Sequence, residues 1–128
     1  MHKRITLLLV LVAGGFLSGC GKSAPWAGQA EPVDIAQAMA DYRDALKRID
    51  KLEYATALVK LERVSPLFDQ AGDGTHAAES LFWLGFCREK LQYEDMARET
   101  YVDVIERYPL SKPAKYAKTR LDAMNQPS

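Results

Sequence analysis

Few residues of this chain could do chemistry. The sequence has two histidines and two cysteines among 128 residues. His76 stands beside a glycine-rich loop, and one histidine cannot by itself build a multi-histidine metal site or a catalytic relay. We therefore expect His76 to be a solvated surface residue. Cys87 lies in the most apolar segment, where we expect it to behave as a small buried hydrophobe.

The carboxylates show no pattern typical of a catalytic or metal site. Asp69 and Asp73 flank a glycine-rich turn at 72–74, but this turn lacks the ligand density of a calcium loop. Helical pairs such as Glu89 and Asp95 are typical of solvated charges. The sequence has no Gly-rich phosphate motif and no Gly-x-Ser-x-Gly motif. We predict no catalytic residue, no metal and no cofactor, and therefore not an enzyme.

The N-terminus has the pattern of a bacterial export signal. His2, Lys3 and Arg4 form a positive start, and the segment from Ile5 to Leu17 is mostly apolar or small. This segment is too short to span a membrane, because a spanning helix needs about 20 apolar residues. We therefore do not expect a permanent transmembrane anchor here.

The end of this signal contains a cysteine after small residues. The stretch Leu17-Ser18-Gly19-Cys20 resembles the lipobox of bacterial lipoproteins. The resemblance implies that residues 1–19 are a signal peptide, that the Cys20 sulfur is diacylated, and that cleavage frees its amino group for acylation too. Two or more acyl chains give stable anchoring. The implied location is the bacterial cell envelope, and Gly21 is compatible with an outer-membrane anchor facing the periplasm.

The charge balance limits the partners that we expect. Loss of Lys3 and Arg4 leaves 15 basic and 17 acidic residues, so we predict that no polybasic patch takes part in anchoring. A formal net charge of zero for the whole chain argues against nucleic acid. Residues 20–33 contain Gly, Ser and Pro without an apolar period, which predicts a flexible tether. Trp26 in this tether fits two interpretations: a place at the membrane interface or a contact with the folded domain.

From residue 34 to residue 128 the apolar residues recur every three or four positions, which predicts an all-α domain. Asp34 and Ser111 can cap the first and last helices, and Thr75 can cap the third. The glycines at 72–74 and Pro109 interrupt the pattern. Residues 50–53 contain neither Gly nor Pro, so a single helix over 34–68 remains an alternative to a turn there.

One interval in this domain has the spacing of a known repeat. Gly85 follows Leu84, and Ala97 stands midway between Gly85 and Pro109. The spacing resembles the tetratricopeptide repeat, a helical hairpin of about 34 residues, here over 78–111. Small residues at 85 and 97 allow two helices to approach, and Tyr101 fills the adjacent space. The resemblance implies two tetratricopeptide-like hairpins plus a C-terminal capping helix.

The segment before this repeat is a weaker copy. In its first helix Tyr42 corresponds to Leu81, and in its second helix Ala57 corresponds to Ala97. Tyr42 lies 39 residues before Leu81, whereas Ala57 lies 40 residues before Ala97. We therefore expect the internal turns of the two hairpins to differ by one residue. In this register Leu46 stands where the repeat prefers glycine. Two unrelated amphipathic hairpins are the alternative.

The segment 107–111, followed by Ala114, Ala117 and Leu121, is similar to the repeat boundary of bacterial envelope tetratricopeptide proteins. These include the lipoprotein of the outer-membrane β-barrel assembly machinery and the periplasmic cell-division coordinator of the Tol–Pal system, and the lipobox makes the first of the two the better likeness. That family has more repeats than this chain can hold.

The repeat resemblance also implies a binding surface. The first helix of each hairpin lines a concave groove, and the register implies four partner-binding residues there: Glu79, Phe82, Phe86 and Glu89. Their counterparts in the first copy are Ala40, Arg43, Lys47 and Asp50. The alternative is that Phe82 and Phe86 pack under the first hairpin or the tether.

The expected function is a lipid-anchored envelope adaptor that binds a partner protein through its helical repeats, in outer-membrane or envelope assembly. The alternative is a structural lipoprotein that associates with itself and has no peptide groove.

Overall fold

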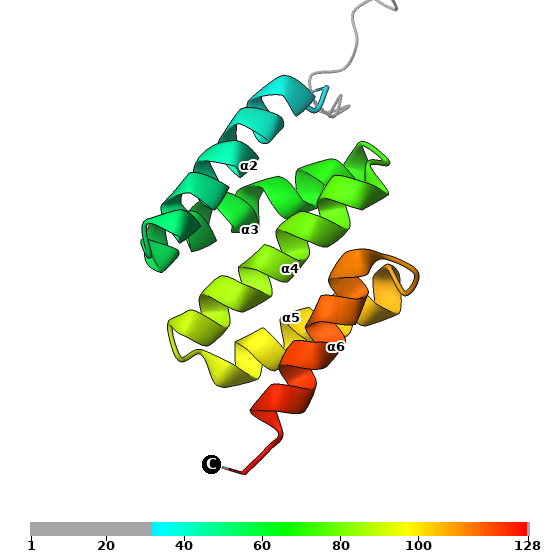
Figure 1. Cartoon of the computed structure of the whole chain (residues 1–128). Helices are drawn as coiled ribbons and strands as arrows, with labels where there is room; N and C mark the ends of the chain where they lie inside the picture. Colours follow the sequence, from blue (N-terminus) through cyan, green and yellow to red (C-terminus); the bar gives the residue numbers. More distant parts are fainter. Residues whose placement is uncertain (1–31, 128) are drawn as a thin grey trace, which may run out of the picture. The chain divides into compact units, whose positions relative to one another are not determined.

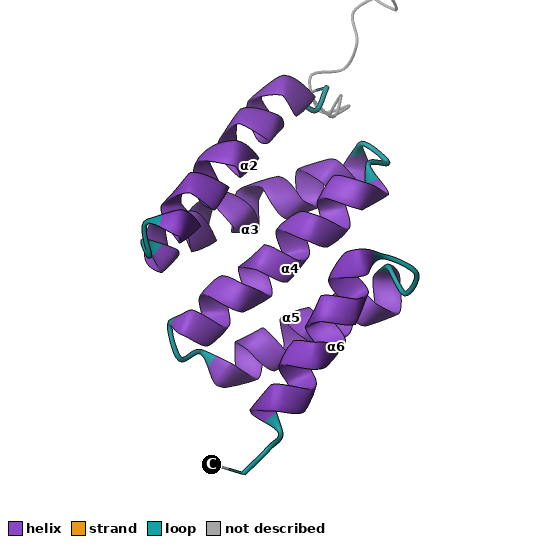
Figure 2. Cartoon of the chain, in the orientation of Figure 1, coloured by secondary structure: helices purple, strands orange, loops and turns teal. Residues whose placement is uncertain are grey.

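The computed structural model describes residues 32–127, which form five α-helices joined by short turns (Figures 1 and 2). The helices are α2 (Ile35–Asp50), α3 (Tyr54–Gln70), α4 (Gly74–Lys90), α5 (Glu94–Arg107) and α6 (Lys112–Met124). No strand occurs within this range. The prediction of an all-α fold with two helical hairpins and a C-terminal helix is confirmed.

Consecutive helices pack against each other in antiparallel pairs, so α2, α4 and α6 run in one direction and α3 and α5 in the other. The α4 helix lies between α3 and α5 and also contacts α6. A single apolar core runs through both hairpins, and its fully buried members include Leu61, Phe68 and Tyr101. Two alanines of α6, Ala114 and Ala117, continue this core, which explains how the last helix covers the second hairpin.

A turn separates α2 from α3, so the single long helix considered for residues 34–68 does not form. Leu52 in this turn has φ 62° and Gln92 in the α4–α5 turn has φ 64°, both in the left-handed region. The residue after each donates its N–H to a carbonyl five positions back: Glu53 to Arg48 (2.9 Å) and Tyr93 to Arg88 (2.8 Å). The two turns thus share one geometry at corresponding positions of the two hairpins.

These turns correct the register expected for the first copy. The internal turns do not differ in length, because residues 51–53 and residues 91–93 separate the paired helices, and a single offset of 40 residues holds through both helices of the hairpin. When Leu52 is aligned with Gln92, Ala45 and not Leu46 is the counterpart of Gly85. Both Ala45 and Gly85 are buried, as close helix packing requires. The first-copy groove positions move accordingly to Met39, Tyr42, Leu46 and Ile49, whereas Ala40, Arg43, Lys47 and Asp50 are exposed.

The predicted caps are correct at two helices and wrong at one. The side chain of Asp34 accepts from the Gln37 N–H (3.0 Å), and that of Ser111 accepts from the Ala114 N–H (3.1 Å). Thr75 does not cap α4. Asp73 does, and it accepts from the His76 N–H (3.1 Å). Since Gly74 already belongs to the first turn of α4, Thr75 lies too far inside the helix to serve.

The close approach inside the second hairpin is as expected. A Cβ atom added to Gly85 would lie 2.8 Å from Cε1 of Tyr101, which is closer than carbon atoms can pack. Ala97 is fully buried on the facing helix. The small residues at 85 and 97 therefore make room for the Tyr101 ring.

Candidate functional site

A row of five aromatic rings crosses three helices, and we call it the aromatic face. It runs from Tyr54 at the start of α3 through Phe86, Trp83 and Phe82 of α4 to Tyr116 of α6. Adjacent ring centroids are 6.1, 5.4, 5.4 and 5.9 Å apart in this order. These separations lie within the range of favourable aromatic contact. The row is therefore one packed unit.

The rings differ in their access to solvent. Phe82 is only 9% exposed because Trp83, Tyr101 and Tyr116 surround it. Tyr54, Trp83 and Phe86 are half-buried, and Tyr116 is 57% exposed. The surface that a partner could contact is therefore made by these four rings, with Phe82 beneath them as support.

The two acids predicted beside this groove are engaged within the chain. Glu79 accepts a hydrogen bond from the Tyr42 hydroxyl (3.1 Å). Glu89 accepts from the Tyr101 hydroxyl (2.8 Å) and from Nε of Arg120 (3.0 Å), with a second contact from the Arg120 guanidinium. These bonds tie α4 to α2, α5 and α6. Glu89 is paired with a cation of the chain itself, whereas Glu79 is bonded to a neutral hydroxyl and keeps its negative charge.

The pKa shifts reflect these contacts. Burial by itself would raise the pKa of the Glu89 carboxyl, but the hydrogen bonds from Arg120 and Tyr101 outweigh burial and hold the pKa below its ordinary value. Burial, the charge of Glu79 and the hydrogen bond to it raise the pKa of Tyr42. Glu89 therefore stays ionised and Tyr42 stays neutral at neutral pH.

A positive charge stands at one end of the face. Nζ of Lys90 lies 5.2 Å from the centroid of the Phe86 ring, which is within the range of a cation–π interaction. This contact lies one turn beyond Phe86 on α4. It makes the accessible rim near Phe86 cationic, opposite in sign to the rim expected from Glu89.

Sequence reasoning missed three rings of the aromatic face. In the sequence Tyr54 and Trp83 are parts of apolar segments, and Tyr116 stands between Ala114 and Ala117 without a pattern of its own. The spacing of Trp83 and Phe86, three positions apart on one helix, was a usable signal. No local signal could place Tyr54 and Tyr116 beside them, because these residues come from other helices.

The isolated histidine and cysteine are both part of the packing. Cys87 is fully buried, and burial raises the pKa of its thiol to about 12, so the nucleophilic thiolate is suppressed. His76 is not the solvated surface residue that the sequence predicts. Its ring centroid lies 5.3 Å from that of Phe68, and its Nδ1 lies 2.6 Å from the Asp73 carboxylate. Over residues 32–127 no cluster of three or more His, Cys, Asp and Glu side chains could hold a metal ion.

The predicted lipidation site and tether lie outside the described residues. Cys20 and Trp26 belong to the segment 1–31, so acylation stays a prediction. Within the described part of the chain, no helix has the length and hydrophobicity needed to cross a membrane. Comparisons with protein-family models, curated proteins and solved structures find no match to this chain.

Proposed function

We propose that this protein is a lipid-anchored adaptor of the bacterial cell envelope that binds a partner protein through its aromatic face. Cys20 carries the lipid, the tether spaces the domain from the membrane, and the helical hairpins hold the binding face. The domain performs no catalysis in this proposal. The tetratricopeptide-like character of the hairpins belongs to the same proposal.

The observation that carries the proposal is the accessible part of the aromatic face. Trp83, Phe86 and Tyr116 are large rings that keep solvent exposure although they pack on a core. Aromatic anchors of this kind dominate the energetics of protein interfaces. The support beneath them is rigid, because Phe82 is buried and the Glu89–Arg120 pair joins α4 to α6. A rigid aromatic surface loses little entropy on binding.

The repeated geometry supports a binding role for the same reason. The two hairpins share their internal turn and their small buried residues at 45 and 85. Stacked hairpins of this kind place their first helices side by side. This arrangement gives an extended surface suited to a helix or an extended peptide.

The test is capture of partners from detergent-solubilised membranes by the tagged, full-length protein. Trp83→Ala and Phe86→Ala should each weaken capture of a partner by about 1–3 kcal/mol, the cost typical of removing an interface anchor. Val59→Ala is the matched control, since Val59 is 66% exposed on α3 and lies outside the aromatic face. This control should capture the partner as the wild type does.

Folding of each variant is checked by thermal unfolding followed by circular dichroism. Folded Trp83→Ala and Phe86→Ala variants with undiminished capture would place the binding surface elsewhere. Recovery of the chain itself and no other protein would favour the structural, self-associating lipoprotein.

A further inference from the structure

The direction of the helices brings particular turns to one end of the domain. Because α2, α4 and α6 are parallel, their N-termini share one end with the C-termini of α3 and α5. The Tyr108 hydroxyl at the end of α5 bonds to Asp69 at the end of α3 (2.7 Å), in agreement with this arrangement. The chain leads into α2 from residue 32 at this same end (Figure 1). We call it the leading end of the domain.

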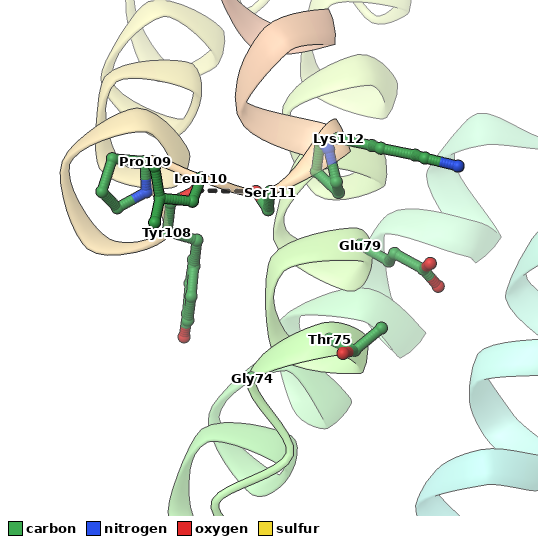
Figure 3. A pocket seen from close by; sticks show the side chains of 9 residues that line it. Gly74, Thr75, Glu79, Tyr108, Pro109, Leu110, Ser111 and Lys112 are labelled. Atoms are coloured by element: carbon green, nitrogen blue, oxygen red, sulfur yellow. Dashed lines mark hydrogen bonds between the residues drawn. The ribbon is translucent and has the colours of Figure 1, made fainter.

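The leading end carries an apolar projection. Between α5 and α6 the chain turns through the segment 108–113, which we call the α5–α6 corner. Leu110 at its tip is 97% exposed, and Pro109 beside it is also exposed. A hollow of about 540 Å³ separates the corner from the first turns of α4 at Gly74, Thr75 and Glu79 (Figure 3). The Leu110 side chain is thus not used by the core.

Three lysines lie on α6, one at the end of the corner and two just after it. Lys112, Lys115 and Lys118 are all exposed, and within residues 32–127 none forms an ion pair with a carboxylate. By contrast, Arg107 and Arg120 on either side are both paired with acids. Asp69 at the leading end is paired with Arg107, whereas Asp73 contacts the His76 ring and Glu79 contacts the Tyr42 hydroxyl. The first two turns of α6 carry three lysines and no acid, so this segment is positive, although the chain as a whole is not.

We propose that the α5–α6 corner docks on an anionic phospholipid surface, with Leu110 in the interfacial layer and the α6 lysines against headgroup phosphates. This inference rests on the lipid anchor of the proposed function. An apolar tip beside unpaired lysines has the chemistry of an interfacial membrane contact. A lipid surface is favoured over a second protein because the proposed anchor precedes α2 in the chain, and the N-terminus of α2 lies at this end of the domain. Docking would fix which way the aromatic face points.

The test uses the full-length protein, produced in a bacterial host and reconstituted in vesicles of phosphatidylcholine with phosphatidylglycerol. A Leu110→Cys variant carries an environment-sensitive fluorophore at the corner. A Leu52→Cys variant is the matched control, because Leu52 is 70% exposed in the α2–α3 turn at the opposite end. Cys87 is fully buried and does not compete for the label. Nitroxide-labelled lipids should quench the fluorophore at 110 strongly and the fluorophore at 52 weakly.

Charge reversal tests the lysines. In the Leu110→Cys background, Lys112→Glu with Lys115→Glu should lower the ratio of docked to undocked protein by roughly tenfold or more, because each lysine near an anionic surface contributes measurably. Lys47→Glu with Lys51→Glu, exposed near the opposite end, should leave the ratio unchanged. For labelled Leu110→Cys protein with its lysines unchanged, vesicles of pure phosphatidylcholine or high salt should likewise reduce quenching of the fluorophore at 110.

Flotation with the vesicles separates the two proposals. Protein that does not float lacks the anchor, and the proposed function fails. Protein that floats but shows equal quenching at 110 and 52 keeps its anchor and overturns the docking inference. Quenching at 110 that needs added membrane proteins would also overturn it, in favour of a protein partner.

Discussion

At the scale of single residues, contacts between helices decide which side chains are tolerated. Gly85 has no side chain because Tyr101 occupies the space where a Cβ would lie. Glu89 looks like a solvated helix charge in the sequence, yet Tyr101 and Arg120 both donate to it. Each residue is explained by partners on other helices, far from it in the chain.

Gly85→Ala should destabilise the domain by about 1–3 kcal/mol, the usual cost of overpacking. The added methyl group would meet Cε1 of Tyr101 at 2.8 Å and Cδ1 at 2.9 Å, so a buried ring must move. The measurement is the free energy of unfolding from urea titration. Gly74→Ala is the control, because nothing lies within 4 Å of its added Cβ. Its stability should be unchanged or slightly higher, and equal losses in both variants would contradict the assignment.

Glu89→Gln should remove part of the dependence of stability on pH. The pKa of Glu89 is below its ordinary value of 4.5 in the folded state, so the unfolded chain binds the proton more readily. The stabilisation by the Glu89 carboxylate is thus present above this ordinary value and is lost as pH falls through the lowered pKa. The difference in unfolding free energy between wild type and Glu89→Gln should therefore shrink as the pH falls from neutral to acid. A difference independent of pH would refute this role, and Glu106→Gln, an exposed residue, serves as control.

At the scale of elements, helix starts alternate between two kinds. The helices α2, α4 and α6 each begin with a side-chain cap, from Asp34, Asp73 and Ser111. The helices α3 and α5 have no side-chain cap and begin directly after a turn with a left-handed residue. The caps open each hairpin and the last helix, but the left-handed turn is not confined to the hairpins: Gly72 before α4 has φ 75°, and the Asp73 N–H donates to the Phe68 carbonyl five positions back (2.9 Å).

Asp73→Ala should cost about 0.5–2 kcal/mol of stability, the usual loss for a helix N-cap. The Asp73 side chain accepts from the His76 N–H and also contacts the His76 ring. Thr75→Ala is the matched control, because Thr75 is exposed inside the helix and should cost little. Thermal unfolding of both variants shows which of the two side chains caps α4. A larger loss for Thr75→Ala would restore Thr75 as the cap.

At the scale of the whole molecule, the parallel course of α2, α4 and α6 gives the helical domain two different ends. The leading end has the projecting Leu110 and receives the chain at residue 32, whereas the opposite end carries the turns at Leu52 and Gln92. The aromatic face lies along the sides of the helices and is not confined to either end. A lipid anchor and a binding face could therefore act at the same time.

Cys20→Ala should abolish membrane attachment in our proposal. Wild-type protein should stay with membranes washed in high salt, whereas the variant should be released or accumulate as an unprocessed precursor. Cys87→Ala is the control and should remain attached, because Cys87 is buried in the helical domain. Wild-type protein that washes off as readily as Cys20→Ala would show that the lipoprotein interpretation is wrong.

Local chemistry explains why several predictions from the sequence hold. The apolar period, the caps at Asp34 and Ser111 and the close contact at Gly85 depend on short-range patterns or on a recognised repeat spacing. The start of α4 is less certain locally, because Asp73 and Thr75 are both good capping residues two positions apart. In the structure the His76 N–H donates to the Asp73 side chain, which identifies Asp73 as the cap of α4.

The sequence by itself determined that the described residues form amphipathic helices paired in hairpins, because helix formation depends on neighbours a few positions apart. Tertiary structure decided which face of each helix is accessible. Successive residues are about 100° apart around a helix, so a register error of one residue exchanges buried Tyr42 for exposed Arg43. The same packing placed Tyr116 beside Phe82 and Tyr54 beside Phe86, and it paired Glu89 with Arg120. None of these contacts between helices has a local signal, since each joins residues that only the packing of separate helices brings together.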